Sequence, residues 1–382
     1  NIMLRKIEIS GLYSFGIETQ IVDFTAKPKS KLKNTKYEYN FNLSQVGKPM
    51  KSAVFFGKNT SGKTNFFIGV KILLNIIKYG FSHTLREHLV DNAFNKNSNS
   101  VKLNIELSDN SKNIFAYSIE FNKEYVLKET FLKNNKIIYK FENERATFDI
   151  YSKKENEQLG MFFSRKLSEN IFYFLKDFEI EQKEIFINLI NNIEVYMNSN
   201  YSKKYNFEFE ENKKQYFLEH KESILEVFQL LDKTIKDFEF KKYKKDEKNI
   251  YEIFFIRNGK KFNYQIESEG IKKIVYFADK ITQIIKEGKI IFIDELDSSI
   301  STLALILIFN NLINTEENHN GQLIVSSHNV LLFDVSFLNS QQIFLIQKDQ
   351  HLESKIRTYY DYDIRSEKKK AYIDYLKGLY DE

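Results

Sequence analysis

The stretch "AVFFGKNTSGKTNFFIGVKILL" (residues 53–74) decides the fold, because it contains the spacing G-x-x-x-x-G-K-T from Gly57 to Thr64. The apolar segment 52–57 predicts a short buried strand, and 64–80 has helical periodicity and ends at a glycine. In this arrangement the glycine loop presents backbone N–H groups to phosphates at the N-terminus of the helix. The stretch therefore predicts a site for a nucleoside triphosphate.

Each residue type in this loop has an expected task. Lys63 is expected to contact the β- and γ-phosphates, and the Thr64 hydroxyl is expected to bind Mg²⁺. A glycine-rich turn without a ligand is the alternative, and the flanking strand and helix argue against it. The residues expected to bind the triphosphate here are Gly57, Asn59, Ser61, Gly62, Lys63, Thr64 and Asn65.

An acidic pair follows a second apolar strand, in "GKIIFIDELDSSI" (288–300). The apolar run ends in Asp294 and Glu295, the pattern of a Walker B motif. We expect Asp294 to hold Mg²⁺ and Glu295 to orient and deprotonate the attacking water. Read alone, the pair could also be an ordinary strand terminus; the upstream phosphate loop favours the catalytic interpretation.

A single histidine, His328, ends the apolar strand of "GQLIVSSHNVLLFD" (321–334). One predicted helix separates this strand from the Walker B strand, so the two strands are expected to be neighbours. Active sites of parallel sheets lie at the carboxyl ends of their strands. We therefore expect His328 to sense the γ-phosphate, whereas the other five histidines have no such position.

The tripeptide Ser268-Glu269-Gly270 opens a predicted helix upstream of Asp294. A hydroxyl, a bare backbone N–H and the positive end of a helix dipole suit a phosphate. A plain helix N-cap is the alternative for Ser268, and its place before the Walker B motif favours the phosphate-binding interpretation.

Composition bounds the class of protein. The 382 residues are 42% hydrophobic and 29% charged, which is typical of a globular protein, and the absence of cysteine excludes disulfides and thiolate metal sites. No apolar run approaches the roughly 18 residues of a membrane span, and no signal peptide is recognisable, so a cytoplasmic protein without membrane contact is expected. The net charge of +5 is too mild to predict nucleic-acid binding, because lysine is abundant throughout.

The rest of the chain alternates in type. Residues 101–142 read as strands, 165–235 as helix and 250–268 as a hairpin around Asn258-Gly259. Helices and strands then alternate, which predicts a parallel, doubly wound core. The helical segment is expected to present one apolar face made of Phe217, Ile224, Phe228, Leu231 and Ile235.

These patterns predict an α/β protein with three parts. Residues 1–140 are expected to form a first lobe, which has mixed N-terminal strands, the Walker A motif and a β-rich segment. Residues 141–240 form a mainly helical insertion, and 241–382 form the second lobe with the hairpin, signature, Walker B and histidine.

The order Walker A, insertion, S-x-G, Walker B and histidine resembles that of ABC-type ATPase heads. "IEISGLYSF" (7–15) is similar to the opening of the SMC, RecF and OLD branch. "GKNTSGKTNFF", "ESEGIKKI", "IDELDSSI" and "QLIVSSHNVLLFD" resemble bacterial AAA-type proteins of abortive infection, the group of AbiLii and of AriA, the ATPase of the PARIS defence system. Residues 230–242 and 367–382 resemble the same group.

The resemblance implies a head-to-head homodimer, or a larger homo-oligomer, formed around ATP and Mg²⁺. Ser268 and Gly270 of one copy would complete a site built by Lys63, Thr64, Asp294, Glu295 and His328 of the other. Two features depart from the pattern: Ser301 stands where relatives carry Asp or His, and no Q-loop glutamine is identifiable, residues 91–97 being the best candidate region.

No Toprim-like metal cluster is recognisable after His328, so any effector is expected to be a separate, nuclease-like or Toprim-like protein from a neighbouring gene. The resemblance implies a sensor or scaffold in anti-phage defence, triggered by DNA or a phage protein. The alternative is a RecF-like DNA-repair ATPase that binds DNA directly. A transporter subunit is disfavoured, because the signature is E-S-E-G and not L-S-G-G-Q.

Overall fold

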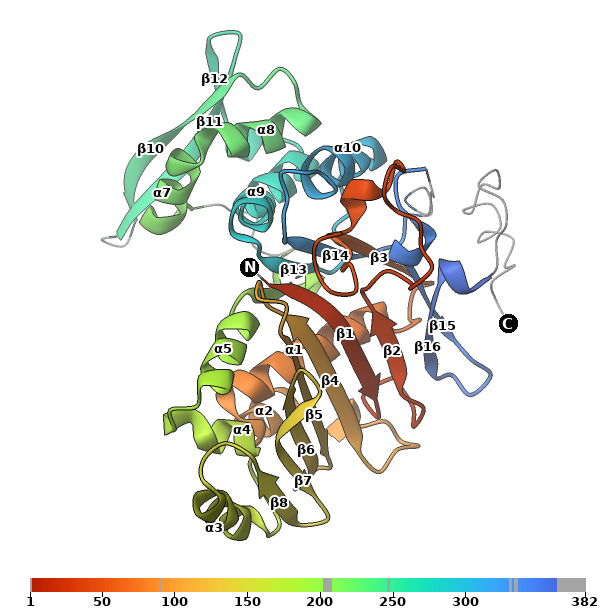
Figure 1. Cartoon of the computed structure of the whole chain (residues 1–382). Helices are drawn as coiled ribbons and strands as arrows, with labels where there is room; N and C mark the ends of the chain where they lie inside the picture. The colour runs from red at the N-terminus through yellow and green to blue at the C-terminus, as the bar shows by residue number, and fades with distance from the viewer. Residues whose placement is uncertain are drawn as a thin grey trace.

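A computed structural model describes residues 2–89, 91–201, 208–245, 248–329, 332 and 336–362. Over these residues the chain forms sheets of seven, six and three strands. Figure 1 shows the seven-stranded sheet in the lower half, the six-stranded sheet above it, and the three-stranded sheet projecting at the top. Residues 367–382, which resemble the same group of abortive-infection proteins, lie outside the described residues.

The six-stranded sheet carries the phosphate loop and is parallel except at one edge. Its order is β16-β15-β3-β14-β13-β9, and only the β15–β16 pair within it is antiparallel. This confirms the predicted parallel core and the predicted neighbours, the Walker B and histidine strands. Its strands are β3 (Ser52–Phe56), β9 (Ile193–Tyr196), β13 (Ile290–Ile293), β14 (Gln322–Ser327), β15 (Ile343–Lys348) and β16 (Ser354–Thr358).

Both faces of this sheet are buried, because alternate residues enter different cores. Phe55, Phe292 and Phe344 face the core that contains α1 (Lys63–Tyr79). Their neighbours along the strands face the core that contains α9 (Glu269–Glu287) and α10 (Thr302–Ile308). Helices on both faces make the core doubly wound, and α10 continues into a π-helical turn, Phe309–Ile313.

The seven-stranded sheet is antiparallel and has the order β2-β1-β4-β5-β6-β7-β8. It confirms the two strands predicted at the N-terminus and the strand-rich character of 101–142. Helices α1, α2 (Phe81–His88), α4 (Ile171–Phe174) and α5 (Glu181–Ile190) lie against one of its faces (Figure 1). The strands are β1 (Met3–Ser10), β2 (Gln20–Asp23), β4 (Val101–Ser108), β5 (Ile114–Phe121), β6 (Val126–Lys133), β7 (Lys136–Glu142) and β8 (Arg145–Phe148).

A buried carboxylate joins this sheet to the helices beside it. Glu129 of β6 is 0% exposed and accepts hydrogen bonds from the hydroxyls of Tyr117 (3.0 Å) and Tyr139 (2.7 Å). It also accepts bonds from the backbone N–H groups of Ile171 (2.6 Å) and Phe172 (2.9 Å), which begin α4. Burial raises the pKa of Glu129 to about 7, against the lowering effect of these donors.

The three-stranded sheet confirms the predicted hairpin and adds one strand to it. Strands β11 (Lys248–Arg257) and β12 (Lys260–Asn263) pair around Asn258-Gly259, and β10 (Asp237–Lys245) pairs with the other edge of β11. Helices α7 (Glu211–Glu219) and α8 (Lys221–Leu231) accompany this sheet. Phe217 and Ile224 are buried and helical, as predicted, but they lie on two helices that are divided at His220, whose φ/ψ is −111°/32°.

Two further differences concern the segment expected to be a helical insertion. Its strand β9 pairs with β13 and so belongs to the parallel core. Ile235, expected on the helical face, lies beyond the end of α8 and is buried beside β10. The remaining helices of this segment are α3 (Lys153–Phe163) and α6 (Asn198–Tyr201).

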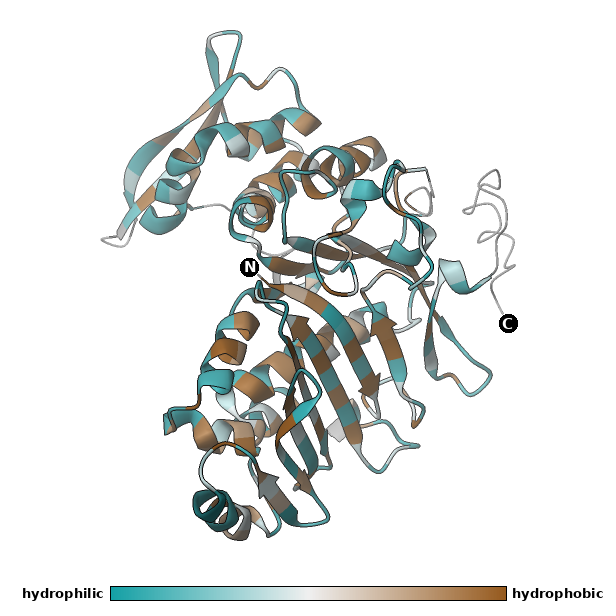
Figure 2. Cartoon of the chain, in the orientation of Figure 1, coloured by the Kyte–Doolittle hydropathy of each residue, from teal (hydrophilic) through white to brown (hydrophobic). Residues whose placement is uncertain are grey.

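The hydropathy of the elements follows this layering. In Figure 2 the strands of the antiparallel sheet alternate along their length, whereas the central strands of the parallel core are mostly brown. This contrast is the one expected between a sheet covered on one face and a sheet covered on both. Among the described residues, no helix is long and apolar enough to cross a membrane.

Candidate functional site

The phosphate loop (Gly57–Gly62) connects β3 to α1 at the carboxyl edge of the parallel sheet. Its two glycines are required by space and by backbone conformation. A Cβ at Gly57 would lie 2.2 Å from Ser61 Oγ, and Gly62 has a φ of +113°, which side chains rarely adopt. The side chains of Lys58, Asn59 and Thr60 are exposed at the tip of the loop.

Lys63 begins α1 and directs its ammonium group back over the loop. Its Nζ donates to the carbonyl oxygens of Gly57 and Lys58 (3.1 Å for Lys58) and lies 3.2 Å from Nδ1 of His328. Lys63 is 4% exposed, and this burial lowers its pKa to about 8, against the raising effect of nearby carboxylates, first among them Glu295. The cation is therefore held at the place where the loop would bind phosphates.

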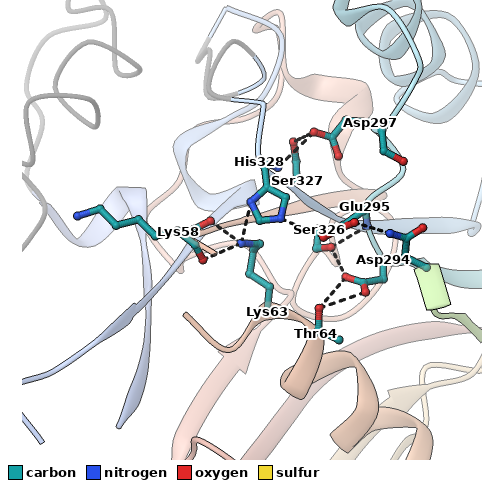
Figure 3. A network of polar contacts seen from close by, with 12 residues as sticks. Lys58, Lys63, Thr64, Asp294, Glu295, Asp297, Ser326, Ser327 and His328 are labelled. Carbon is teal, nitrogen blue, oxygen red and sulfur yellow. Dashed lines mark hydrogen bonds and ion pairs between the residues drawn. The ribbon is translucent and has the colours of Figure 1, made fainter. Parts of the chain in front are cut away.

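Thr64 and Asp294 meet beside this lysine, although they come from different ends of the chain. The Thr64 hydroxyl lies 3.2 Å from Asp294 Oδ2 and 3.5 Å from Oδ1. Ser326, from the neighbouring strand β14, donates its hydroxyl to Asp294 Oδ1 at 2.5 Å. Burial raises the pKa of Asp294, and the Ser326 hydrogen bond opposes that effect. Figure 3 shows these side chains converging below Lys63.

Glu295 is held at both of its carboxylate oxygens. Oε1 lies 3.0 Å from Nε2 of His328, and Oε2 accepts a hydrogen bond from the side-chain amide of Asn198. The backbone N–H of Glu295 donates to Ser326 Oγ at 2.9 Å. Its φ of +54° is a left-handed conformation that a non-glycine residue adopts at an energetic cost, and such strain gathers at functional sites.

The turn that carries His328 is fixed by Asp297. One oxygen of Asp297, Oδ2, accepts hydrogen bonds from the Ser327 hydroxyl (2.8 Å) and from the backbone N–H groups of His328 (3.2 Å) and Asn329 (3.0 Å). The acidic segment after β13 thus positions the imidazole that follows β14 (Figure 3).

The Ser268–Gly270 segment opens α9 as predicted, with Ser268 as its N-cap. The Ser268 side chain is exposed and accepts a hydrogen bond from the N–H of Ile271 at 3.3 Å. Gly270 packs closely: a Cβ there would lie 2.4 Å from the carbonyl oxygen of Ser299, in the segment after the Walker B motif. The recorded contacts of these two residues are thus with their own helix and with that segment, not with the phosphate loop of the same chain.

Lys273, one turn further along α9, ties the same two segments together. It is 0% exposed, and its Nζ donates to the carbonyl oxygens of Glu295 (2.5 Å) and Ser298 (3.0 Å) and to the Ser298 hydroxyl (2.6 Å). Burial lowers the pKa of Lys273 to about 8, while Asp297 and its acidic neighbours act in the opposite direction.

The structure therefore brings together Lys63, Thr64, Asp294, Glu295 and His328 within one chain. Asn65, also predicted, turns away and donates to the hydroxyl of Ser14 at 2.9 Å. Ser301 caps α10 by accepting from the N–H of Ala304 at 3.2 Å.

Residues 91–97, the best candidate for the Q-loop, lie elsewhere. The carbonyl oxygen of Ala93 accepts from the N–H of Tyr13, and Asn95 donates to the Tyr13 carbonyl oxygen at 2.8 Å. The side chain that reaches Glu295 is that of Asn198, which begins α6 directly after β9, the strand paired with β13. Four residues of the site were missed: Asn198, Lys273, Asp297 and Ser326. A signal existed for Ser326 and Asp297, since both stand inside the motif strings "VSSH" and "IDELD".

The arrangement fits ATP with Mg²⁺. The Thr64 hydroxyl and the Asp294 carboxylate offer adjacent oxygens, the ligand type that Mg²⁺ prefers, and the ion commonly takes its other ligands from phosphates and water. Among the described residues, no three His, Cys, Asp or Glu side chains are grouped to hold a metal. The hydroxyl of Ser61 is buried and has no hydrogen-bond partner in the described part of the chain, so the inside of the loop retains binding capacity.

A family model described as "AAA domain, putative AbiEii toxin, Type IV TA system" matches residues 52–334, which is more than half of the 382 residues. The match begins at the strand before the phosphate loop and ends after His328, so it includes the whole constellation described above. No curated protein sequence matches the chain.

Solved structures share the fold. The SMC head bound to the C-winged helix domain of ScpA is similar with a TM-score of 0.53 and 13% identity, over 93% of this chain and 97% of that one. The Smc head domain with a coiled coil and joint from Pyrococcus yayanosii has a TM-score of 0.52 and 10% identity, over 100% of both chains. At such identities the likeness shows the fold of an SMC-type ABC-ATPase head, as the sequence predicted.

Proposed function

The chain belongs to the family of AAA domains described as putative AbiEii toxin, type IV toxin–antitoxin system, and on that premise we propose that it binds and hydrolyses ATP with Mg²⁺. One observation carries the proposal. Lys63 and Thr64 of the phosphate loop meet Asp294, Glu295 and His328 at the carboxyl edge of one parallel sheet. A cation, a pair of oxygen ligands and a held carboxylate are the parts that phosphoryl transfer to water requires.

Each side chain has a definite task in this proposal. The loop amides and Lys63 bind and orient the phosphates. Thr64 and Asp294 would hold Mg²⁺, which when bound neutralises phosphate charge. Glu295 accepts a proton from the attacking water, and Asn198 and His328 hold its carboxylate so that one orientation is populated. His328, which lies 3.2 Å from Lys63 Nζ, is placed to report on the γ-phosphate.

We further propose that ATP joins two copies of the chain head to head. Ser268 is exposed at the positive end of the 19-residue helix α9, where its hydroxyl accepts a hydrogen bond from the N–H of Ile271. The sequence resemblance implies that this serine completes the phosphate site of a second copy. Lys273 would then connect each signature helix to the catalytic loop of its own chain.

The biological role follows from the family and from the subgroup resemblance. We propose a sensor or scaffold of anti-phage defence, whose nucleotide state holds or releases a separate effector, similar to the ATPase of the PARIS system. Co-purification with the products of neighbouring genes, in ATP and in ADP, tests this role. An ATP-sensitive complex with a nuclease-like or Toprim-like protein is expected, and the absence of any ATP-sensitive partner would contradict the role.

Two variants test the enzymatic proposal. Glu295→Gln keeps the size of the side chain and one acceptor oxygen but removes the base. The variant should therefore bind ATP, lose hydrolysis and accumulate as a dimer or larger assembly. Lys63→Ala should lose nucleotide binding. Hydrolysis by Glu295→Gln at the wild-type rate would refute the assignment of the base.

The DNA-repair alternative has a different signature in the same assay. Direct DNA binding by exposed lysines, such as Lys241, Lys242 and Lys244 on β10, predicts turnover stimulated by duplex DNA and binding that weakens steeply with salt. Turnover that is independent of DNA and of salt would favour the defence proposal.

A further inference from the structure

A serine far from the sequence motifs contacts the phosphate loop. Ser354 is the first residue of β16 and is 1% exposed. Its hydroxyl donates to the carbonyl oxygen of Ser61 at 2.6 Å, inside the loop. It also lies close to Gly62, since a Cβ at that glycine would be 2.2 Å from Ser354 Oγ. The hairpin of β15 and β16 therefore packs directly against the loop residues that would surround the phosphates.

Ser14, from the N-terminal lobe, contacts the same serine. The hydroxyls of Ser354 and Ser14 are 2.7 Å apart, and the N–H of Ser354 donates to the Ser14 carbonyl oxygen at 2.7 Å. Ser14 Oγ accepts a hydrogen bond from the side-chain amide of Asn65, on the first turn of α1, at 2.9 Å. The two serines thus contact residues on either side of Gly62, at the end of the loop where α1 begins: Ser61 before it and Asn65 after it.

The hairpin that carries Ser354 is anchored on the N-terminal segment. A Cβ at Gly16 would overlap the carboxylate of Glu353, and Lys355 forms an ion pair with Glu18 at 2.5 Å. The N–H of Ile356 donates to the side chain of Gln20 at 2.9 Å. These contacts fix the position of Ser354 relative to β1 and β2, so the serine pair is held from two sides.

We propose that Ser354, together with Ser14, is a positioning residue that holds the phosphate loop in its binding conformation. The inference rests on the proposed function, because it assigns the pair to the nucleotide site. The hydroxyl of Ser354 is hydrogen-bonded to Ser14 and Ser61, on the loop side of the site. Loss of the Ser354 hydroxyl should therefore weaken nucleotide binding and leave the rate of the chemical step unchanged. Since the loop amides bind the α- and β-phosphates as well, ATP and ADP should be affected alike.

The test measures binding of Mg·ATP and Mg·ADP by calorimetry, and kcat and KM for ATP hydrolysis, in the full chain. Ser354→Ala should raise both Kd values and KM by about tenfold, a change of about 1.4 kcal/mol and the size of one or two lost hydrogen bonds, with kcat within about twofold of wild type. The matched control is Thr358→Val on the same strand. Thr358 is 8% exposed, and its hydroxyl has no hydrogen-bond partner among the described residues, so binding should not change.

A second variant keeps the test decisive if Ser354→Ala folds poorly. Ser14→Ala should weaken binding too, and the double variant should lose less than the sum of the two single effects, because the two hydroxyls are hydrogen-bonded to each other. Unchanged Kd values in Ser354→Ala, fully additive effects, or a fall in kcat at constant KM would overturn the inference. Failure of the wild-type chain to bind Mg·ATP would overturn the proposed function itself.

Discussion

Nε2 of His328 lies 3.0 Å from Oε1 of Glu295, so that the residues following two neighbouring parallel strands meet over the phosphate loop. The same imidazole reaches Lys63 through its other nitrogen. One side chain thus contacts both the cation that would bind phosphate and the carboxylate that would activate water. This geometry allows occupancy of the γ-phosphate position to be linked to the orientation of the base.

Asn198 should matter for the rate and not for affinity. Asn198→Ala removes a donor that holds the Glu295 carboxylate, so kcat should fall by about 10- to 100-fold with little change in KM. Steady-state ATPase assays check this. Asn192→Ala is the matched control, because its side chain donates to the Asn188 carbonyl oxygen near the surface. Equal rates for the Asn198 variant and wild type would remove Asn198 from the site.

Lys273 should contribute to both stability and catalysis. Lys273→Met leaves the carbonyl oxygens of Glu295 and Ser298 without their buried donor, which should cost about 1–3 kcal/mol of unfolding free energy. It should also lower kcat, because the backbone of Glu295 loses a contact. Denaturant titration and ATPase assays measure the two effects. Lys272→Met, which removes only an ion pair with Glu269, should be near neutral in both.

Nucleotide affinity should fall in alkaline solution. Burial lowers the pKa of Lys63 to about 8, so its ammonium group is protonated at neutral pH and loses its charge as the pH rises through that value. The Kd for ATP, measured in Glu295→Gln, should be flat near neutrality and rise by up to about tenfold per pH unit above the pKa. Lys273→Met should retain this rise in Kd above the pKa, since Lys273 Nζ donates to the backbone of Glu295 and Ser298 in the segment after the Walker B strand. A pH-independent Kd would contradict the assignment to Lys63.

Glu129 should make stability depend on pH in a definite direction. Its pKa is raised from 4.5 to about 7 by burial, so folding favours the protonated form. The stabilisation is complete below the unfolded pKa of 4.5 and is lost as the pH rises through about 7. Thermal unfolding of wild type and Glu129→Gln across this range checks it: the difference in Tm should change between these values and stay constant on either side. A constant difference throughout would contradict the raised pKa.

The motif residues were predictable because each motif is local. The motif from Gly57 to Thr64 is formed by one strand, one loop and one helix that follow each other in the sequence. The apolar runs before Asp294 and His328 likewise predict buried strands that end in polar groups. Alternation of helix and strand then placed those ends on one edge of a parallel sheet, which the structure confirms. The doubly wound core follows from the same local patterns.

Contacts between distant segments were not predictable from one sequence. Asn198 joins the site because β9, inside a segment that reads as helical, pairs with β13. Lys273 and Ser354 are a lysine and a serine without a motif, and only the packing of α9 and β16 gives them partners. The predicted apolar face is shared by separate elements for a related reason. Phe217 and Ile235 are buried in the same core as residues of β10 and β11, although they do not lie on one helix.

The central claim, that ATP is sandwiched between two copies, is tested most directly by mixing two inactive variants. Lys63→Ala lacks a functional phosphate loop, and Ser268→Arg lacks a functional signature, so neither should hydrolyse ATP alone. In a mixed dimer one site combines Lys63 of one chain with Ser268 of the other, and the mixture should recover up to about a quarter of the wild-type rate, because half of the dimers are mixed and each has one intact site. A mixture as inactive as its components, or full activity of Ser268→Arg alone, would contradict the claim.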